Sequence, residues 1–200
     1  TLCKLTEEDI KNTNHLIKDN GINIFIHSSY LINIGNKIDD KVKGIIIDDF
    51  VIGDRVGGKG VIFHVGKHCN RYTEKECLDL MVENINMIIG ITCNIGIKFI
   101  LETGCNCGTE VCTSIDKYKY IYDRVEEKSR FGFCIDTCHI WAAGYELIDI
   151  YNLTKKNKNF KDIIVIHINN SKNPKNSHLD RHEIIDKGFI NFNEILNFLK

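Results

Sequence analysis

Five short apolar runs, spaced at similar intervals, constrain the fold of this chain more than any other feature. They lie at residues 22–27, 60–64, 97–102, 131–136 and 163–167. Each is short and rich in β-branched side chains, as β-strands are. The segments between them carry apolar residues at helical spacing. Strand and helix therefore alternate, and this alternation predicts parallel βαβ units and an α/β fold.

The helical segments carry their own start and stop signals. Thr73 and Glu76 have the spacing of a capping box, and an apolar stripe through Met81 and Ile85 follows them. A second apolar stripe at helical spacing runs through residues 118–125. The first helix is expected to begin near Thr6 and to end at Asn20-Gly21.

Each of the five predicted strands ends in a side chain that can bind a metal ion. The strand ends are His27, His64, Glu102, Asp136 and His167. They are separated by 37, 38, 34 and 31 residues, about one strand-helix unit each. In a parallel barrel the C-terminal ends of all strands lie on one rim, where active sites are built. These side chains are therefore expected to converge, and imidazoles with carboxylates are the ligand types of zinc sites.

Taken singly, each of these residues has an ordinary structural interpretation. A strand-end histidine is commonly a hydrogen-bonding residue, and a strand-end Asp is commonly a helix N-cap. Their joint occurrence at five successive strand ends favours the metal site. Two further features support it: His139 follows Asp136 by three residues, and Asp180 and His182 are two apart, so that both would point the same way from an extended loop.

Nine cysteines suggest a second kind of site, but their spacing does not support it. No C-x2-C pair occurs, so a structural zinc site built from cysteines is disfavoured. Cys134 lies two residues before Asp136 on a predicted strand and is expected to pack one layer deeper on the same face.

No signal peptide or membrane-spanning stretch is apparent, so the cysteines are interpreted as reduced and the protein as intracellular (cytoplasmic, nuclear or viral) and not secreted.

The segments CIDTCHIWAAGYEL, LDRHEIIDKGFI, HINNSK and HSSYLINIGN closely resemble the signatures of the endonuclease IV family of apurinic/apyrimidinic endonucleases. The resemblance covers residues 24–190. It implies a TIM (β/α)8 barrel with a centre of three zinc ions, in which manganese or iron can substitute. It also implies base-excision repair of double-stranded DNA, by cleavage 5′ to abasic sites that leaves a 3′-hydroxyl and a 5′-deoxyribose phosphate.

Carried over residue by residue, the resemblance assigns eight metal ligands and two DNA contacts. The ligands it implies are His27, His64, Glu102, Asp136, His139, His167, Asp180 and His182. Glu102 would bridge two ions and is the expected catalytic residue. Tyr30 and Leu31 match side chains that enter the DNA minor groove. The chain departs from the family pattern at Asn170, where Asp is usual, and at Thr103-Gly104; neither position is an expected ligand.

The composition fits one soluble domain over residues 1–200, which we expect to be a monomer. Hydrophobic residues make up 43% of the chain, and the net charge is −1, so charge alone gives no support to nucleic-acid binding. The resemblance implies a barrel fragment, truncated at both ends, that lacks the first two strands and the last strand with its glutamate ligand. We therefore expect the chain by itself to be poorly stable and inactive.

Two alternatives to the nuclease stay open at this point. One is a sugar isomerase or epimerase of the xylose-isomerase-like barrels, which share the architecture and the ligands at the strand ends. The other is a DNA-binding remnant without catalytic activity, because five strands cannot close a barrel of eight.

Overall fold

Five parallel strands form a single sheet in the order in which they occur along the chain. The computed structural model describes residues 5–156 and 162–199. The strands are β1 (Phe25–His27), β2 (Gly60–Phe63), β3 (Lys98–Glu102), β4 (Phe131–Asp136) and β5 (Ile163–His167). Each pairs in parallel with the next. This is the arrangement of a TIM barrel with five strands instead of eight, and it confirms the predicted α/β fold and partial barrel.

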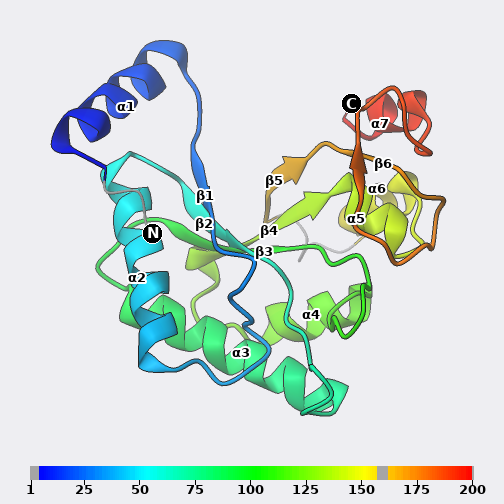
Figure 1. Ribbon diagram of the computed structural model, residues 1–200, viewed down its shortest axis with the longest axis horizontal. Coiled ribbons are helices and arrows are strands. Elements are labelled where there is room, and N and C mark those ends of the chain that lie inside the picture. The colour runs from blue at the N-terminus through cyan, green and yellow to red at the C-terminus, as the bar shows by residue number, and fades with distance from the viewer. Residues whose placement is uncertain (1–4, 157–161, 200) are drawn as a thin grey trace.

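Helices connect successive strands, as parallel pairing requires. The connecting helices are α2 (Asp40–Arg55), α3 (Glu74–Ile91), α4 (Ile115–Arg124), α5 (Thr137–Ala142) and α6 (Leu147–Lys156), with a short 3-10 turn, η1 (Lys128–Arg130). Helix α1 (Glu7–Asn20) precedes β1, and α7 (Phe192–Phe198) follows β5. Figure 1 shows α2, α3 and α4 along one side of the sheet, and α5, α6 and α7 grouped beside β4 and β5. None of the helices in the described ranges has the length and apolar character needed to span a bilayer.

Capping residues set where several helices begin and end. Thr6 and Asp9 form a capping box at α1, which ends at Gly21 in the left-handed conformation. Thr73 and Glu76 form the predicted capping box at α3. Asp39 caps α2, a helix that the sequence analysis did not delimit. Each cap gives a backbone N–H at the helix start an acceptor that it would otherwise lack.

The two faces of the sheet have different roles, because successive side chains of a strand point to opposite faces. On one face, apolar side chains pack against the helices in the largest buried core cluster; from the strands it includes Val61, Phe63, Phe99, Leu101, Phe131 and Phe133. On the other face, a smaller buried cluster holds Ile62, Ile100 and Cys134. Glu102 and Asp136 lie one layer above Ile100 and Cys134 on that second face, at the C-terminal ends of the strands.

A small second sheet holds the segment that follows β5. In it, β6 (Asn170–Ser171) pairs antiparallel with β7 (His182–Glu183), so that Ser171 lies opposite His182. Asn170 is fully buried, and its amide group donates to the carbonyls of Ile185 and Ile190. The pairing brings the loop that carries Asp180 back over the strand ends. The sequence analysis placed this segment in a loop and did not predict the pairing.

Candidate metal centre

All eight predicted ligands converge at the C-terminal rim of the sheet. Three groups made up of predicted ligands alone have ligand atoms within 4.8 Å of one another: His27 with His64 and Glu102; Glu102 with Asp136 and His139; and His139 with Asp180 and His182. The eighth residue, His167, places Nδ1 2.6 Å from Glu102 Oε1 and 3.7 Å from Asp136 Oδ2. The structure thus brings together every residue that the sequence analysis proposed for the site. That these residues bind metal stays a prediction.

Glu102 lies at the centre of the site and contacts imidazoles with both carboxylate oxygens. Its Oε2 is 3.1 Å from His27 Nε2 and 3.3 Å from His64 Nδ1, and its Oε1 accepts from His167. Burial alone would raise the pKa of Glu102, but the hydrogen bonds from His167 and His27 hold it well below its usual range. Glu102 is therefore an ionised carboxylate with one oxygen toward each half of the site.

The histidines at the centre differ in their preferred protonation state. The hydrogen bond to Glu102 raises the pKa of His27. Burial lowers the pKa of His64, which favours the neutral imidazole that a metal ion needs. His27 Nδ1 lies 3.1 Å from the carbonyl oxygen of Ser28, which can only accept, so Nδ1 carries the proton. In neutral His27 the free lone pair is therefore on Nε2, the atom that faces Glu102.

His139 carries the strongest indication that the site is built for a cation. Its side chain is 4% exposed, and Nδ1 donates to the Thr103 carbonyl at 2.8 Å. Its buried Nε2 lies 3.3 Å from Asp180 Oδ2 but makes no hydrogen bond to any described residue. Burial alone would lower the pKa of His139, whereas the carboxylates of Asp180, Asp136 and Glu102 raise it to about 10. A buried nitrogen that makes no hydrogen bond, in an imidazole close to three carboxylates, fits a zinc ligand.

Asp136 has two functions at once, one for each oxygen. Its Oδ1 accepts from the backbone N–H groups of Cys138 and His139 and so caps α5. Its Oδ2 accepts from Asn169 Nδ2 at 2.6 Å and lies 3.7 Å from His182 Nε2. The N-cap interpretation of this residue and the ligand interpretation are therefore compatible. The cap also fixes the start of the helix that presents His139.

Tyr30 and Leu31 protrude from the same rim. Tyr30 is 59% exposed and Leu31 is 91% exposed. The Tyr30 ring lies edge-on to the His64 ring, with centroids 5.1 Å apart. Both predicted DNA-contacting side chains are therefore exposed, and Tyr30 borders the candidate metal centre.

Cys134 and Cys138 lie beside the candidate ligands. Cys134 can be grouped with Glu102 and His167, and Cys138 with Asp136 and His182, at ligand spacing. Burial raises the pKa of both thiols, that of Cys138 to about 11. Near neutral pH both are protonated in the metal-free chain, and Cys134 packs in the inner apolar layer with Ile100. The position of Cys134 fits its predicted packing role.

Two further residues support the site: Thr103, which the sequence analysis noted only as a departure from the family pattern, and Asp49, which it did not single out. Thr103 follows the bridging glutamate; its hydroxyl accepts from the Asp136 N–H at 2.9 Å, and its carbonyl accepts from His139. Asp49, on α2, accepts from the Ser28 hydroxyl at 2.7 Å and so holds the residue next to His27. The sequence pointed to Thr103 only through its position directly after Glu102, and no sequence feature pointed to Asp49.

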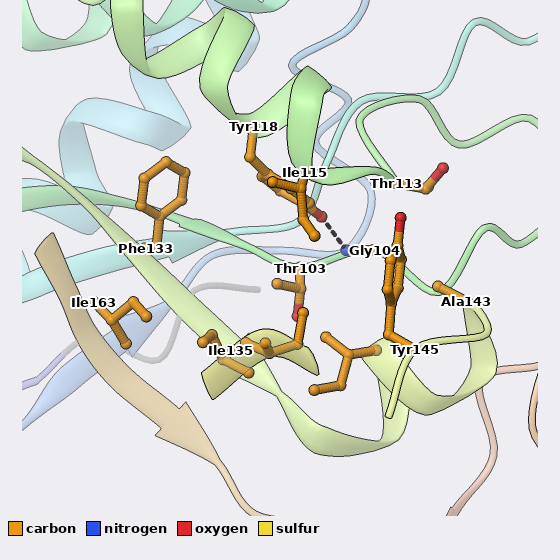
Figure 2. A pocket seen from close by; sticks show the side chains of 12 residues that line it. Thr103, Gly104, Thr113, Ile115, Tyr118, Phe133, Ile135, Ala143, Tyr145 and Ile163 are labelled. Carbon is orange, nitrogen blue, oxygen red and sulfur yellow. Dashed lines mark hydrogen bonds between the residues drawn. The ribbon is translucent and has the colours of Figure 1, made fainter. Parts of the chain in front are cut away.

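An apolar pocket lies beside the metal centre, between α4, β4 and the residues after α5 (Figure 2). Tyr118 and Phe133 line it, and Tyr118 accepts a hydrogen bond from the Gly104 N–H at 2.8 Å. None of the eight candidate ligands lines this pocket. Thr103 borders it and also contacts the site, so the pocket lies directly behind the ligand cluster.

Comparison with known proteins gives consistent matches. A family model described as a xylose isomerase-like TIM barrel matches residues 3–200. The chain is 37% identical to the probable endonuclease 4 of Metamycoplasma arthritidis over 185 residues, which are 88% of this chain and 64% of that protein. It is 33% identical to the probable endonuclease 4 of Phocaeicola vulgatus over 183 residues, which are 87% of this chain and 64% of that protein. The chain thus spans just under two thirds of these relatives.

Solved structures show the same fold. Endonuclease IV from Thermus thermophilus superposes with a TM-score of 0.79 at 20% identity, over 98% of this chain and 71% of that one. An IolI protein with a bound zinc atom superposes with a TM-score of 0.72 at 17% identity, over 95% of this chain and 67% of that one. At these identities the superpositions establish the architecture.

Proposed function

The chain belongs to the endonuclease IV family of xylose isomerase-like TIM barrels, and from this premise we propose that it is a zinc-dependent nuclease that cleaves DNA 5′ to abasic sites. The observation that carries the proposal is the convergence of three ligand groups on one rim, where the buried Nε2 of His139 lies without a hydrogen bond. Zinc is the expected ion, since the donors are imidazoles and carboxylates; manganese or iron could replace it.

In the proposed centre, His27 and His64 would hold one ion together with Glu102. Asp136 and His167 would hold a second ion, which shares Glu102. His139, Asp180 and His182 would hold the third. When bound, zinc would supply a nucleophile at neutral pH and neutralise the charge of the phosphodiester, because it lowers the pKa of a coordinated water from 15.7 to roughly 7.

The residues of the chain contribute orientation and charge. Glu102 can serve two ions because it is ionised and places one oxygen toward each half of the site. Thr103 directs His139 Nε2 inward, because its backbone carbonyl accepts a hydrogen bond from His139 Nδ1. Tyr30 and Leu31, exposed beside the site, would contact the DNA where the abasic nucleotide leaves the stack. Extruding that nucleotide costs less than extruding a paired one, which by itself favours damaged DNA.

Replacing Glu102 with Gln in the full-length protein tests the assignment directly. We expect incision of a duplex with one tetrahydrofuran abasic analogue to fall by at least about 100-fold, since even residues outside the ligand shell cost 10- to 100-fold. Bound zinc, measured by mass spectrometry of the purified chain, should fall in the same variant. Glu83→Gln, at an exposed position on α3, is the matched control and should change neither. Full activity in Glu102→Gln would contradict the proposal.

A sugar isomerase with the same barrel is the alternative enzyme. The third group, formed by His139, Asp180 and His182, favours the nuclease. It would provide ligands for an ion in addition to those that the strand-end residues would hold. Assays of the full-length wild-type protein on abasic duplex and on aldose and ketose sugars separate the two. A full-length protein that binds no zinc and acts on neither would support the DNA-binding remnant. The monomeric state, the single-domain organisation and the intracellular location stay predictions.

A further inference from the structure

Lys67 joins three of the loops that form the rim beside the metal centre. Its backbone pairs with Glu110 as an isolated antiparallel bridge, which links the loop after β2 to the loop after β3. The Asn33 side chain, in the loop after β1, donates to the Lys67 carbonyl at 2.8 Å and accepts from its N–H at 2.9 Å. The backbone of Lys67 is therefore held from both sides.

The side chain of Lys67 lies between an exposed tyrosine and a buried carboxylate. Its Nζ donates a hydrogen bond to the Tyr30 hydroxyl and lies 4.1 Å from the centre of the Tyr30 ring. Glu110 Oε1 is 3.9 Å from the same Nζ. The Glu110 side chain is 6% exposed, and its Oε2 accepts from the backbone N–H groups of Cys105 and Cys107 at 3.1 and 3.0 Å. A fixed negative charge thus anchors the ammonium group.

This arrangement restrains Tyr30, which would otherwise be free to change rotamer. The ring is 59% exposed, yet it contacts His64 on one edge and Lys67 at its hydroxyl. Burial alone would lower the pKa of Lys67, but the bond to Tyr30 and the charge of Glu110 raise it overall, so the ammonium stays charged near neutral pH. A side chain that is already ordered loses less entropy when a ligand binds to it.

We propose that Lys67 is a specificity-determining positioning residue, which holds Tyr30 in the orientation that recognises an abasic nucleotide, while Glu110 fixes the ammonium group. This inference rests on the proposed function. The competing role for a lysine at this rim is a direct contact with a DNA phosphate. The two roles differ in a measurable way, because a positioning residue acts only through Tyr30, whereas a phosphate contact acts independently of it.

A double-mutant cycle distinguishes the two roles. Lys67→Met, Tyr30→Phe and the double variant are compared for binding to a fluorescein-labelled duplex with one tetrahydrofuran analogue and to the same duplex undamaged. A phosphorothioate linkage 5′ to the analogue prevents incision. Tyr30→Phe keeps the ring and removes only the oxygen that Lys67 holds. The readout is the preference for damaged DNA, defined as the ratio of the dissociation constant of the undamaged duplex to that of the abasic duplex. It is measured at several salt concentrations.

We expect each single variant to lower this ratio by about 3- to 10-fold, the cost of ordering one side chain on binding. The double variant should lower the ratio no further than either single variant does. The slope of the logarithm of the binding constant against the logarithm of the salt concentration should not change. Lys67→Arg, which keeps a donor and a cation at the ring, should restore most of the ratio. Lys11→Met, at an exposed position on α1, is the matched control and should leave the ratio unchanged.

Additive effects, together with a salt slope reduced by about 0.9, would overturn the proposal and assign Lys67 to a phosphate. If Lys67→Met fails to fold or loses zinc, Tyr30→Phe alone decides, because an unchanged ratio in that variant also overturns the proposal. A wild-type chain that does not prefer the abasic duplex would refute the proposed function and this inference with it. A wild-type preference combined with an additive cycle refutes the inference alone.

Discussion

At the scale of single residues, the site is organised by side chains that each make two directed contacts. Asp136 caps α5 with one oxygen and faces the site with the other. His139 is fixed at Nδ1 by a carbonyl that can only accept, so its Nε2 must face the cluster. Such second contacts hold a metal ligand in place before the ion arrives and raise the affinity of the site.

The protonation of His139 makes a prediction about the metal-free chain. Its pKa is raised from 6.5 to about 10, so the charged imidazole stabilises the fold below pH 6.5, and this contribution is lost as the pH rises toward about 10. Urea denaturation of the chelator-treated chain should therefore show a stability that falls across this range. His139→Gln should show a smaller fall, and equal pH dependence in the two chains would contradict the assignment.

At the scale of secondary-structure elements, close backbone contacts hold the loops that carry the site. Gly66 follows β2 and lies against Gly35, in the loop after β1. A Cβ at Gly66 would be 2.5 Å from the Gly35 Cα and 2.6 Å from its nitrogen. Since both of these atoms belong to the backbone, neither can move aside cheaply. Only glycine allows the two loops to approach this closely.

Gly66→Ala should therefore destabilise the chain, by about 1–3 kcal/mol as overpacking typically does. Gly44 is the matched control, because it lies within α2 and a Cβ there would meet nothing within 4 Å. Gly44→Ala should stabilise the chain by about 0.5–1 kcal/mol, since alanine has the higher helix propensity. Thermal or urea unfolding of both variants measures the sign of the change in the free energy of unfolding for each. A shift in the same direction for both would refute the packing argument.

At the scale of the whole molecule, the candidate ligands connect parts of the chain that are distant in sequence. They come from the C-terminal ends of all five strands, from α5 and from the segment that leads into β7. The strands form an open sheet, with β1 and β5 at its edges. Ions at the rim would therefore tie the first strand to the last through Glu102, which contacts both His27 and His167.

Zinc should accordingly stabilise the entire fold and not only the rim. Free zinc at 100 times the dissociation constant would add about 2.7 kcal/mol for each independent site. Urea denaturation with zinc and with a chelator measures the gain, and hydrogen exchange should show added protection in β1 and β5 alike. An unchanged midpoint would show that the ligand groups do not bind zinc in the folded chain.

Much of the candidate site could be predicted because the relevant signals are local in sequence. Strand-end residues such as His64 and Glu102 follow apolar runs, and parallel pairing then places them together. The boundaries of β4 and β5 agree with the predicted runs, whereas β1 is shorter than the predicted 22–27. Residues 22–24 make no strand pairing with β2, which begins at the register of Phe25 with Gly60.

The sequence by itself determined the alternation of strands and helices, the capping boxes and the kind of side chain at the strand ends. Each of these depends on residues that are close together in the chain, or on a family signature. Only the tertiary structure decided that Asp49 supports His27 through Ser28, that Asn170 helps to bring His182 over the site, and that Lys67 lies between Tyr30 and Glu110. These contacts join loops from different strands, so their partners are set by packing and distance, which no local pattern encodes.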